Sequence, residues 1–136
     1  LKIKEAHESF KLCFKEGDRV LELGASPGGM SCYFNEKKMV VDAIDPGEMD
    51  ISFKNIASIV HNKRSIQDYH PVPNTPYDWL CCDINLGPDF ILPHLKRILE
   101  KIKLKKGAVI TFKLKSDAFE NVKMIKRMTN FIFAGI

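Results

Sequence analysis

The stretch Arg19–Met30, RVLELGASPGGM, joins an apolar run to a glycine-rich turn. The run 19–23 has the composition of a buried strand, and the segment from the turn onward, 28–37, can open a helix. A glycine-rich turn between a strand and a helix is typical of a ligand-binding loop in α/β proteins. The sequence therefore predicts that a ligand binds at this turn.

The composition of the turn narrows the class of ligand. A dinucleotide-binding turn carries G-x-G-x-x-G, whose second glycine lets the backbone approach a pyrophosphate, and here Ser26 occupies that place. Pro27 also removes a backbone N–H from the turn, which is unfavourable where amides must bind phosphates. A P-loop is excluded because no Gly-Lys-Ser/Thr follows. Asp45 lies about 20 residues beyond Gly24, where an acid can bind ribose hydroxyls. S-adenosylmethionine, a nucleoside without a pyrophosphate, fits this pattern. The alternative is a turn that only packs the helix on the strand, with Asp45 as a helix cap.

Strand-like and helix-like segments alternate along the rest of the chain, which predicts a mostly parallel, twisted sheet with helices on both faces. In such sheets ligands bind at the carboxyl ends of the strands. The 136 residues, 45% of them hydrophobic, suit a single α/β domain over 1–136. We expect strands at 19–23, 39–45, 56–61, 77–84 and 108–114, and helices at 5–14, 28–37, 89–104 and 117–128.

Composition and charge limit the possible partners, cellular location and metal or disulfide chemistry of the protein. A net charge of +4 is compatible with an anionic partner but too small to demonstrate one. No apolar run approaches the ~20 residues of a membrane span, and the N-terminal segment lacks the apolar core of a signal peptide, so we expect a cytoplasmic protein. The cysteines and histidines have no metal-ligand spacing, which predicts neither a metal site nor a disulfide framework. They are Cys13, Cys32, Cys81, Cys82, His7, His61, His70 and His94.

An ordered series of motifs makes the prediction of function more specific. The motifs are SFKL with Lys11, VLELGASPGGMS at 20–31, CCDINLGP with Asp83, and ITFKLK with Lys113. This series resembles the FtsJ family of ribose 2′-O-methyltransferases, especially its RlmM-type branch, which acts on large-subunit ribosomal RNA. The resemblance implies a Rossmann-like methyltransferase fold, S-adenosylmethionine as cofactor, RNA as partner and a Lys-Asp-Lys-Glu catalytic tetrad.

Three members of that tetrad map onto Lys11, Asp83 and Lys113. Lys113 lies at the carboxyl end of a predicted buried strand, where an isolated ammonium is costly unless it is paired or functional. We expect Lys113 to act as general base on the ribose hydroxyl, Asp83 to orient it, and the second cation, Lys11, to favour its neutral form. Lys115 is expected to lie in solvent.

The cofactor is expected to contact the glycine-rich loop, Asp45, Asp83 and an adenine-binding position at Ser65, with Asp68 as a substitute acid. The complete set of predicted cofactor-binding residues is Gly24, Ala25, Ser26, Pro27, Gly28, Gly29, Met30, Asp45, Ser65, Asp68 and Asp83.

The sequence departs from the family pattern at its end, because no glutamate follows Glu120 to complete the tetrad. We expect that the sequence is truncated or gapped there. Two other functions remain open: a catalytically inactive methyltransferase fold that binds RNA or protein, and a small-molecule methyltransferase. For the active protein we expect a monomer.

Overall fold

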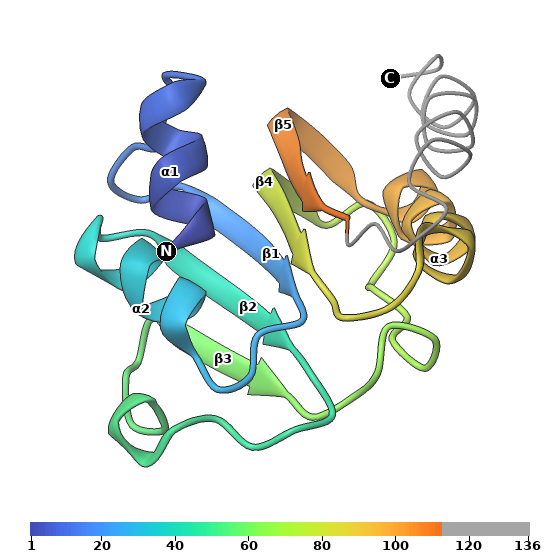
Figure 1. The fold of residues 1–136 in the computed structure, drawn as a ribbon, viewed down its shortest axis with the longest axis horizontal. Helices are drawn as coiled ribbons and strands as arrows, with labels where there is room; N and C mark the ends of the chain where they lie inside the picture. Colours follow the sequence, from blue (N-terminus) through green and yellow to red (C-terminus); the bar gives the residue numbers. More distant parts are fainter. Residues whose placement is uncertain (113–136) are drawn as a thin grey trace.

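The structure is a computed structural model and describes residues 1–112. Helical segments separate consecutive strands along the chain, except that a loop alone joins the third strand to the fourth, as the sequence predicts (Figure 1). In chain order they are α1 (Lys2–Ser9), β1 (Arg19–Leu23), α2 (Gly29–Glu36), β2 (Val40–Ile44), the 3-10 turn η1 (Ile51–Phe53), β3 (Ile59–Asn62), β4 (Pro76–Asp83), α3 (Pro88–Lys101) and β5 (Lys103–Thr111).

The five strands form one sheet in the order β3-β2-β1-β4-β5, and all neighbouring strands are parallel. The chain crosses from one half of the sheet to the other between β3 and β4, so β1 lies between β2 and β4. This order confirms the predicted Rossmann-like α/β fold, and it makes the carboxyl ends of β1, β2 and β4 the expected ligand edge.

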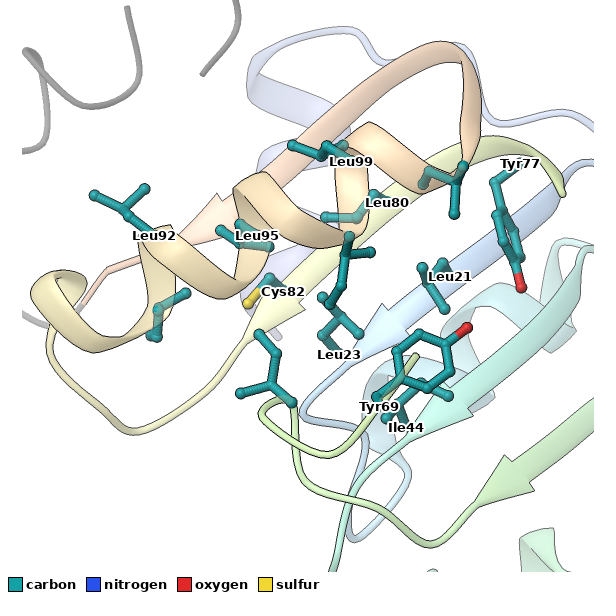
Figure 2. Close-up of a cluster of buried hydrophobic side chains, with 14 residues drawn as sticks. Leu21, Leu23, Ile44, Tyr69, Tyr77, Leu80, Cys82, Leu92, Leu95 and Leu99 are labelled. Atoms are coloured by element: carbon teal, nitrogen blue, oxygen red, sulfur yellow. The ribbon is translucent and has the colours of Figure 1, made fainter. Parts of the chain in front are cut away.

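Each face of the sheet has its own hydrophobic core, because side chains of a strand alternate between faces. Leu21 and Leu23 of β1 pack with α3, as Figure 2 shows for Leu92, Leu95 and Leu99. The opposite face buries a second cluster beneath α1 and α2, which includes Ile3, Val20, Phe34 and Trp79. Within residues 1–112, no helix has both the length and the apolar character needed to cross a membrane.

The first helix is shorter than predicted. α1 ends at Ser9, not at residue 14, and Lys11 adopts a left-handed backbone conformation with φ 50° in the turn that follows. The turn brings Phe14 to the core, where the centroid of its ring lies 4.8 Å from that of Trp79 and 5.6 Å from that of Phe34. Tertiary packing of Phe14 therefore overrides the helical spacing of the sequence.

The boundary between α3 and β5 also differs from the prediction. The helix ends at Lys101, and β5 begins at Lys103, within the segment predicted as helix. Residues 103–107 pair with the first half of β4, from Pro76 to Trp79. Parallel pairing along β4 thus decides the structure of a segment whose apolar spacing alone favours a helix.

A buried carboxylate links β1, β4 and β5 at the amino-terminal edge of the sheet, opposite the carboxyl ends of the strands. Asp18, just before β1, is 7% exposed. It accepts hydrogen bonds from Lys106 Nζ on β5 at 2.8 Å and from Trp79 Nε1 on β4 at 3.0 Å. Burial alone would raise the pKa of Asp18, but these bonds, with one from the Lys15 backbone, outweigh it and lower the pKa below its usual value.

We expect Asp18→Asn to lower the free energy of unfolding by about 1.5–3 kcal/mol at neutral pH, the range for hydrogen bonds to a charged group. Because the folded-state pKa of Asp18 is lowered, its contribution is present above the unfolded-state value and is lost as the pH falls through the folded value. Urea denaturation between pH 2 and pH 7 measures both effects. Glu16→Gln, at an exposed acid two residues away, is the control, and an equal loss in both variants would contradict the assignment.

Candidate functional site

A cavity of about 360 Å³ opens where the carboxyl ends of β1, β2 and β4 meet. We call it the central cavity. Its walls come from the segments that follow β1, β2, β3 and β4, so residues far apart in the sequence converge on it. The lining residues are Leu23, Gly24, Ser26, Ile44, Asp45, Pro46, Ser65, Ile66, Gln67, Asp83, Ile84, Asn85 and Leu86.

A second cavity, of about 300 Å³, lies beside α1. We call it the α1 cavity. Most of its lining is apolar, and Lys2, Asp83 and Thr111 supply its charged and hydroxyl groups. It is lined by Leu1, Lys2, Ile3, Ala6, Met30, Cys82, Asp83, Val109 and Thr111. Asp83 lines both cavities, so the two spaces adjoin at this residue.

The glycine-rich loop is held against the ends of its neighbouring strands. Gly24 N donates to Ile44 O at 2.9 Å, and the Ser26 hydroxyl donates to Glu48 O at 2.6 Å. Gly24 has φ +85°, and a Cβ at this position would overlap the carbonyl oxygen of Asp83. Only glycine suits both the backbone conformation and this close approach.

Asp45 follows β2 directly and lines the central cavity. Its Oδ1 accepts a hydrogen bond of 2.7 Å from Gly47 N, which fixes the carboxylate in a tight turn. The Asp45 carbonyl oxygen lies 3.0 Å from His61 Nε2 on β3. The acid predicted to bind a ribose is thus held at the cavity wall by its own turn and by the next strand.

The other predicted cofactor-binding residues divide between the wall and its surroundings. Ser65 lines the central cavity, and its hydroxyl donates to Asp68 Oδ2 at 3.1 Å; Asp68 lines an adjoining open cavity instead. Met30 lines the α1 cavity. The remaining loop residues are outside the central cavity's lining: Ala25 and Gly28 are buried, and Pro27 and Gly29 are exposed.

Asp83 forms an ion pair with Lys2, not with Lys11. Lys2 Nζ lies 3.5 Å from Asp83 Oδ1, with side chains 56% and 34% exposed. Lys11 is exposed in the turn after α1 and lines neither cavity. Lys2 was not among the residues predicted from the sequence. Its i, i+4 spacing to Ala6, which lines the same cavity, was the available signal.

Lys113 and Lys115 lie outside the described residues. The last described strand residue before them, Thr111, is the register partner of Asp83 and lines the α1 cavity. Lys113 follows Thr111 by two positions in the sequence.

A second carboxyl group that the sequence analysis overlooked is buried behind the loop. Glu22 of β1 is fully buried, and its Oε1 accepts a 2.6 Å hydrogen bond from the Ser31 hydroxyl on α2. Its Oε2 has no hydrogen-bond partner among residues 1–112. Burial first, and then the charges of Asp45 and Asp83, raise the pKa of Glu22 to about 8. The sequence signal was a single charged residue inside the apolar run RVLEL.

Across residues 1–112, no cluster of three or more histidine, cysteine, aspartate or glutamate side chains is arranged to hold a metal ion.

Comparison with known proteins relates this chain to one family. The model of the FtsJ-like methyltransferase family matches residues 1–133. An uncharacterized protein of Methanocaldococcus jannaschii is 30% identical over 133 residues, which cover 96% of this chain and 38% of that protein. The ribosomal RNA large subunit methyltransferase M of Tolumonas auensis is 35% identical over 92 residues, 62% of this chain and 24% of that protein. The chain therefore spans well under two thirds of these relatives.

A solved structure extends the likeness to the whole fold. A Clostridium thermocellum protein, provisionally named as an rRNA methylase, matches with a TM-score of 0.67 at 16% identity. The match covers 94% of this chain and 78% of that one. At this identity the likeness shows a shared fold.

We expect Gly24→Ala to cost more stability than Gly17→Ala, although both glycines have nearly the same φ, +85° and +83°. Gly17 has open space around it, so its substitution carries only the strain of the left-handed conformation, roughly 1–2 kcal/mol. At Gly24 the added Cβ also meets the backbone of β4. Urea denaturation of the two variants measures the difference, and equal losses would contradict the close approach.

Proposed function

The chain belongs to the FtsJ-like methyltransferase family, and from this premise we propose that it transfers a methyl group from S-adenosylmethionine to a ribose 2′-hydroxyl of RNA, with ribosomal RNA as the substrate class. One observation carries the proposal: two cavities of about 360 and 300 Å³ meet at Asp83. Transfer between two bound molecules requires adjoining sites that hold the reacting atoms in line. We assign the cofactor to the central cavity and the acceptor nucleoside to the α1 cavity.

The residues of the central cavity fit S-adenosylmethionine. Asp45 offers a carboxylate to ribose hydroxyls, and the apolar Ile44, Ile66 and Leu86 suit the flat face of an adenine. Pro27 removes one backbone N–H donor from the loop, and Ser26 stands in place of the glycine that would let a pyrophosphate approach the backbone. When bound, the cofactor supplies a methyl group activated by its sulfonium leaving group. The chain's own task is then to position the hydroxyl and to remove its proton.

We propose Lys2 as the cation that Asp83 holds at the acceptor site, in place of Lys11. The 3.5 Å ion pair and the position of Lys2 in the α1 cavity support this assignment. Lys113 remains the proposed general base, supported by the family resemblance and by its closeness in sequence to Thr111, the partner of Asp83. The RNA substrate is supported by the family and by the name of the Tolumonas auensis relative, a ribosomal RNA large subunit methyltransferase.

We expect Asp45→Ala to weaken S-adenosylmethionine binding by about 10- to 150-fold, which corresponds to the ~1.5–3 kcal/mol of hydrogen bonds to a charged group. Isothermal titration calorimetry measures this effect directly. The control is Glu16→Ala, an exposed acid before β1 at the opposite edge of the sheet. Unchanged affinity in folded Asp45→Ala would remove Asp45 from the cofactor site.

We expect Lys2→Ala to slow methyl transfer to RNA at least 10-fold while leaving cofactor affinity within about twofold, because Lys2 lines the acceptor cavity and not the central one. Lys11→Ala should leave the rate nearly unchanged. Single-turnover methylation of ribosomal RNA, followed by mapping of 2′-O-methyl groups, measures both. Loss of activity in Lys11→Ala alone would restore Lys11 to the site. An unmodified chain that binds the cofactor and methylates no RNA would support the inactive-module or the small-molecule alternative.

A further inference from the structure

We propose that Glu22 is a positioning residue that is neutral while the central cavity is empty and ionises, releasing its proton to solvent, when a cationic cofactor binds. This inference rests on the proposed function, because it takes S-adenosylmethionine as the ligand. It concerns a residue that lines neither cavity and that the proposed transfer does not use.

The position of Glu22 connects it to the loop at both ends. On the strand side, Glu22 directly precedes Leu23 and Gly24, which line the central cavity. On the helix side, Ser31 belongs to the first turn of α2 and donates its hydroxyl to Glu22 Oε1 at 2.6 Å. The pair therefore joins the strand and the helix that flank the glycine-rich loop.

The surroundings of the second carboxyl oxygen of Glu22, Oε2, favour a protonated side chain. Glu22 is completely buried, with 0% of its surface exposed, and Oε2 has no hydrogen-bond partner among residues 1–112. A buried carboxylate with an unpartnered oxygen is costly, and the neutral acid removes most of that cost. The empty site therefore favours protonated Glu22.

The charges around Glu22 make its proton sensitive to the ligand. Asp45 after β2 and Asp83 on β4 both act on Glu22 as negative charges. The register partner of Glu22 on β4 is Cys81. Burial raises the pKa of this thiol, so Cys81 remains neutral. The group that α2 contributes is Ser31, a neutral hydroxyl that donates to Glu22. On α1, the charge of Lys2 is paired with Asp83. A cation entering the central cavity beside these carboxylates would offset their repulsion and favour ionised Glu22.

The step balances in atoms and charge. The O–H bond of the Glu22 carboxyl breaks, the proton passes to the buffer, and the carboxylate keeps the hydrogen bond from Ser31. S-adenosylmethionine carries a sulfonium charge that S-adenosylhomocysteine lacks. The two ligands therefore form a matched pair, and the charged one should release more protons.

The test is calorimetric titration of the full chain at pH 7 in buffers of different ionisation enthalpy, which counts protons released per cofactor bound. We expect a release of at least half a proton with S-adenosylmethionine and clearly less with S-adenosylhomocysteine. Glu22→Gln, which mimics the neutral acid, should reduce the release to near zero. Glu36→Gln, at an exposed acid on α2, the helix that carries Ser31, should leave it unchanged.

A second measurement needs no ligand. Because the folded-state pKa of Glu22 is raised from 4.5 to about 8, its stabilising contribution is fully present below the unfolded-state value and is lost as the pH rises through about 8. The free energy of unfolding should therefore fall between pH 5 and pH 8 in the natural sequence and fall less in Glu22→Gln.

The outcomes separate this proposal from the proposed function. Cofactor binding with the same proton count in the natural sequence and in Glu22→Gln overturns the role of Glu22 and leaves the methyltransferase proposal standing. Equal proton release by the two ligands overturns it as well. Absence of any S-adenosylmethionine binding overturns both proposals.

Discussion

The close approach of Gly24 to β4 is the constraint on which the site depends. β1 is the central strand, and its end must turn sharply so that the loop passes over the carboxyl ends of β2 and β4. The hydrogen bond from Gly24 N to Ile44 O holds the loop to β2, and the absence of a side chain lets the same residue contact the Asp83 backbone. Both cavities are bounded by Asp83, so this one contact fixes their common wall.

Packing on the two faces of the sheet gives the two cavities different characters. On one face α3 and the segment that follows β3 pack over Leu21 and Leu23, and Figure 2 shows Tyr69 and Ile44 at the edge of this cluster. On the other face α1 buries Ile3 in the second core. The burial of Ile3 positions its neighbour Lys2, so a core contact determines where a charged group of the α1 cavity lies.

The carboxyl-terminal edge of the sheet differs in charge from the molecule as a whole. The chain carries a net charge of +4, yet Glu22, Asp45 and Asp83 gather at the carboxyl ends of β1, β2 and β4. Such a cluster suits a cationic ligand, and the Lys2 ion pair balances part of it on the α1 side. The buried Asp18 at the opposite edge has hydrogen-bond donors on β4 and β5, which lower its pKa. Glu22, by contrast, has a single donor, Ser31, in the part of the chain that the structure describes, and its pKa is raised.

The sequence by itself determined most strands and helices, the glycine-rich loop after β1 and the position of Asp45 directly after β2, because these features depend on local periodicity and on short spacings. Tertiary structure decided the end of α1 and the start of β5, since contacts of Phe14 and pairing with β4 override local helical spacing. It also decided that Lys2, not Lys11, meets Asp83, and that one oxygen of Glu22 has no hydrogen-bond partner within the described residues 1–112. Such pairings join residues distant in sequence, and only the packing of elements brings them together.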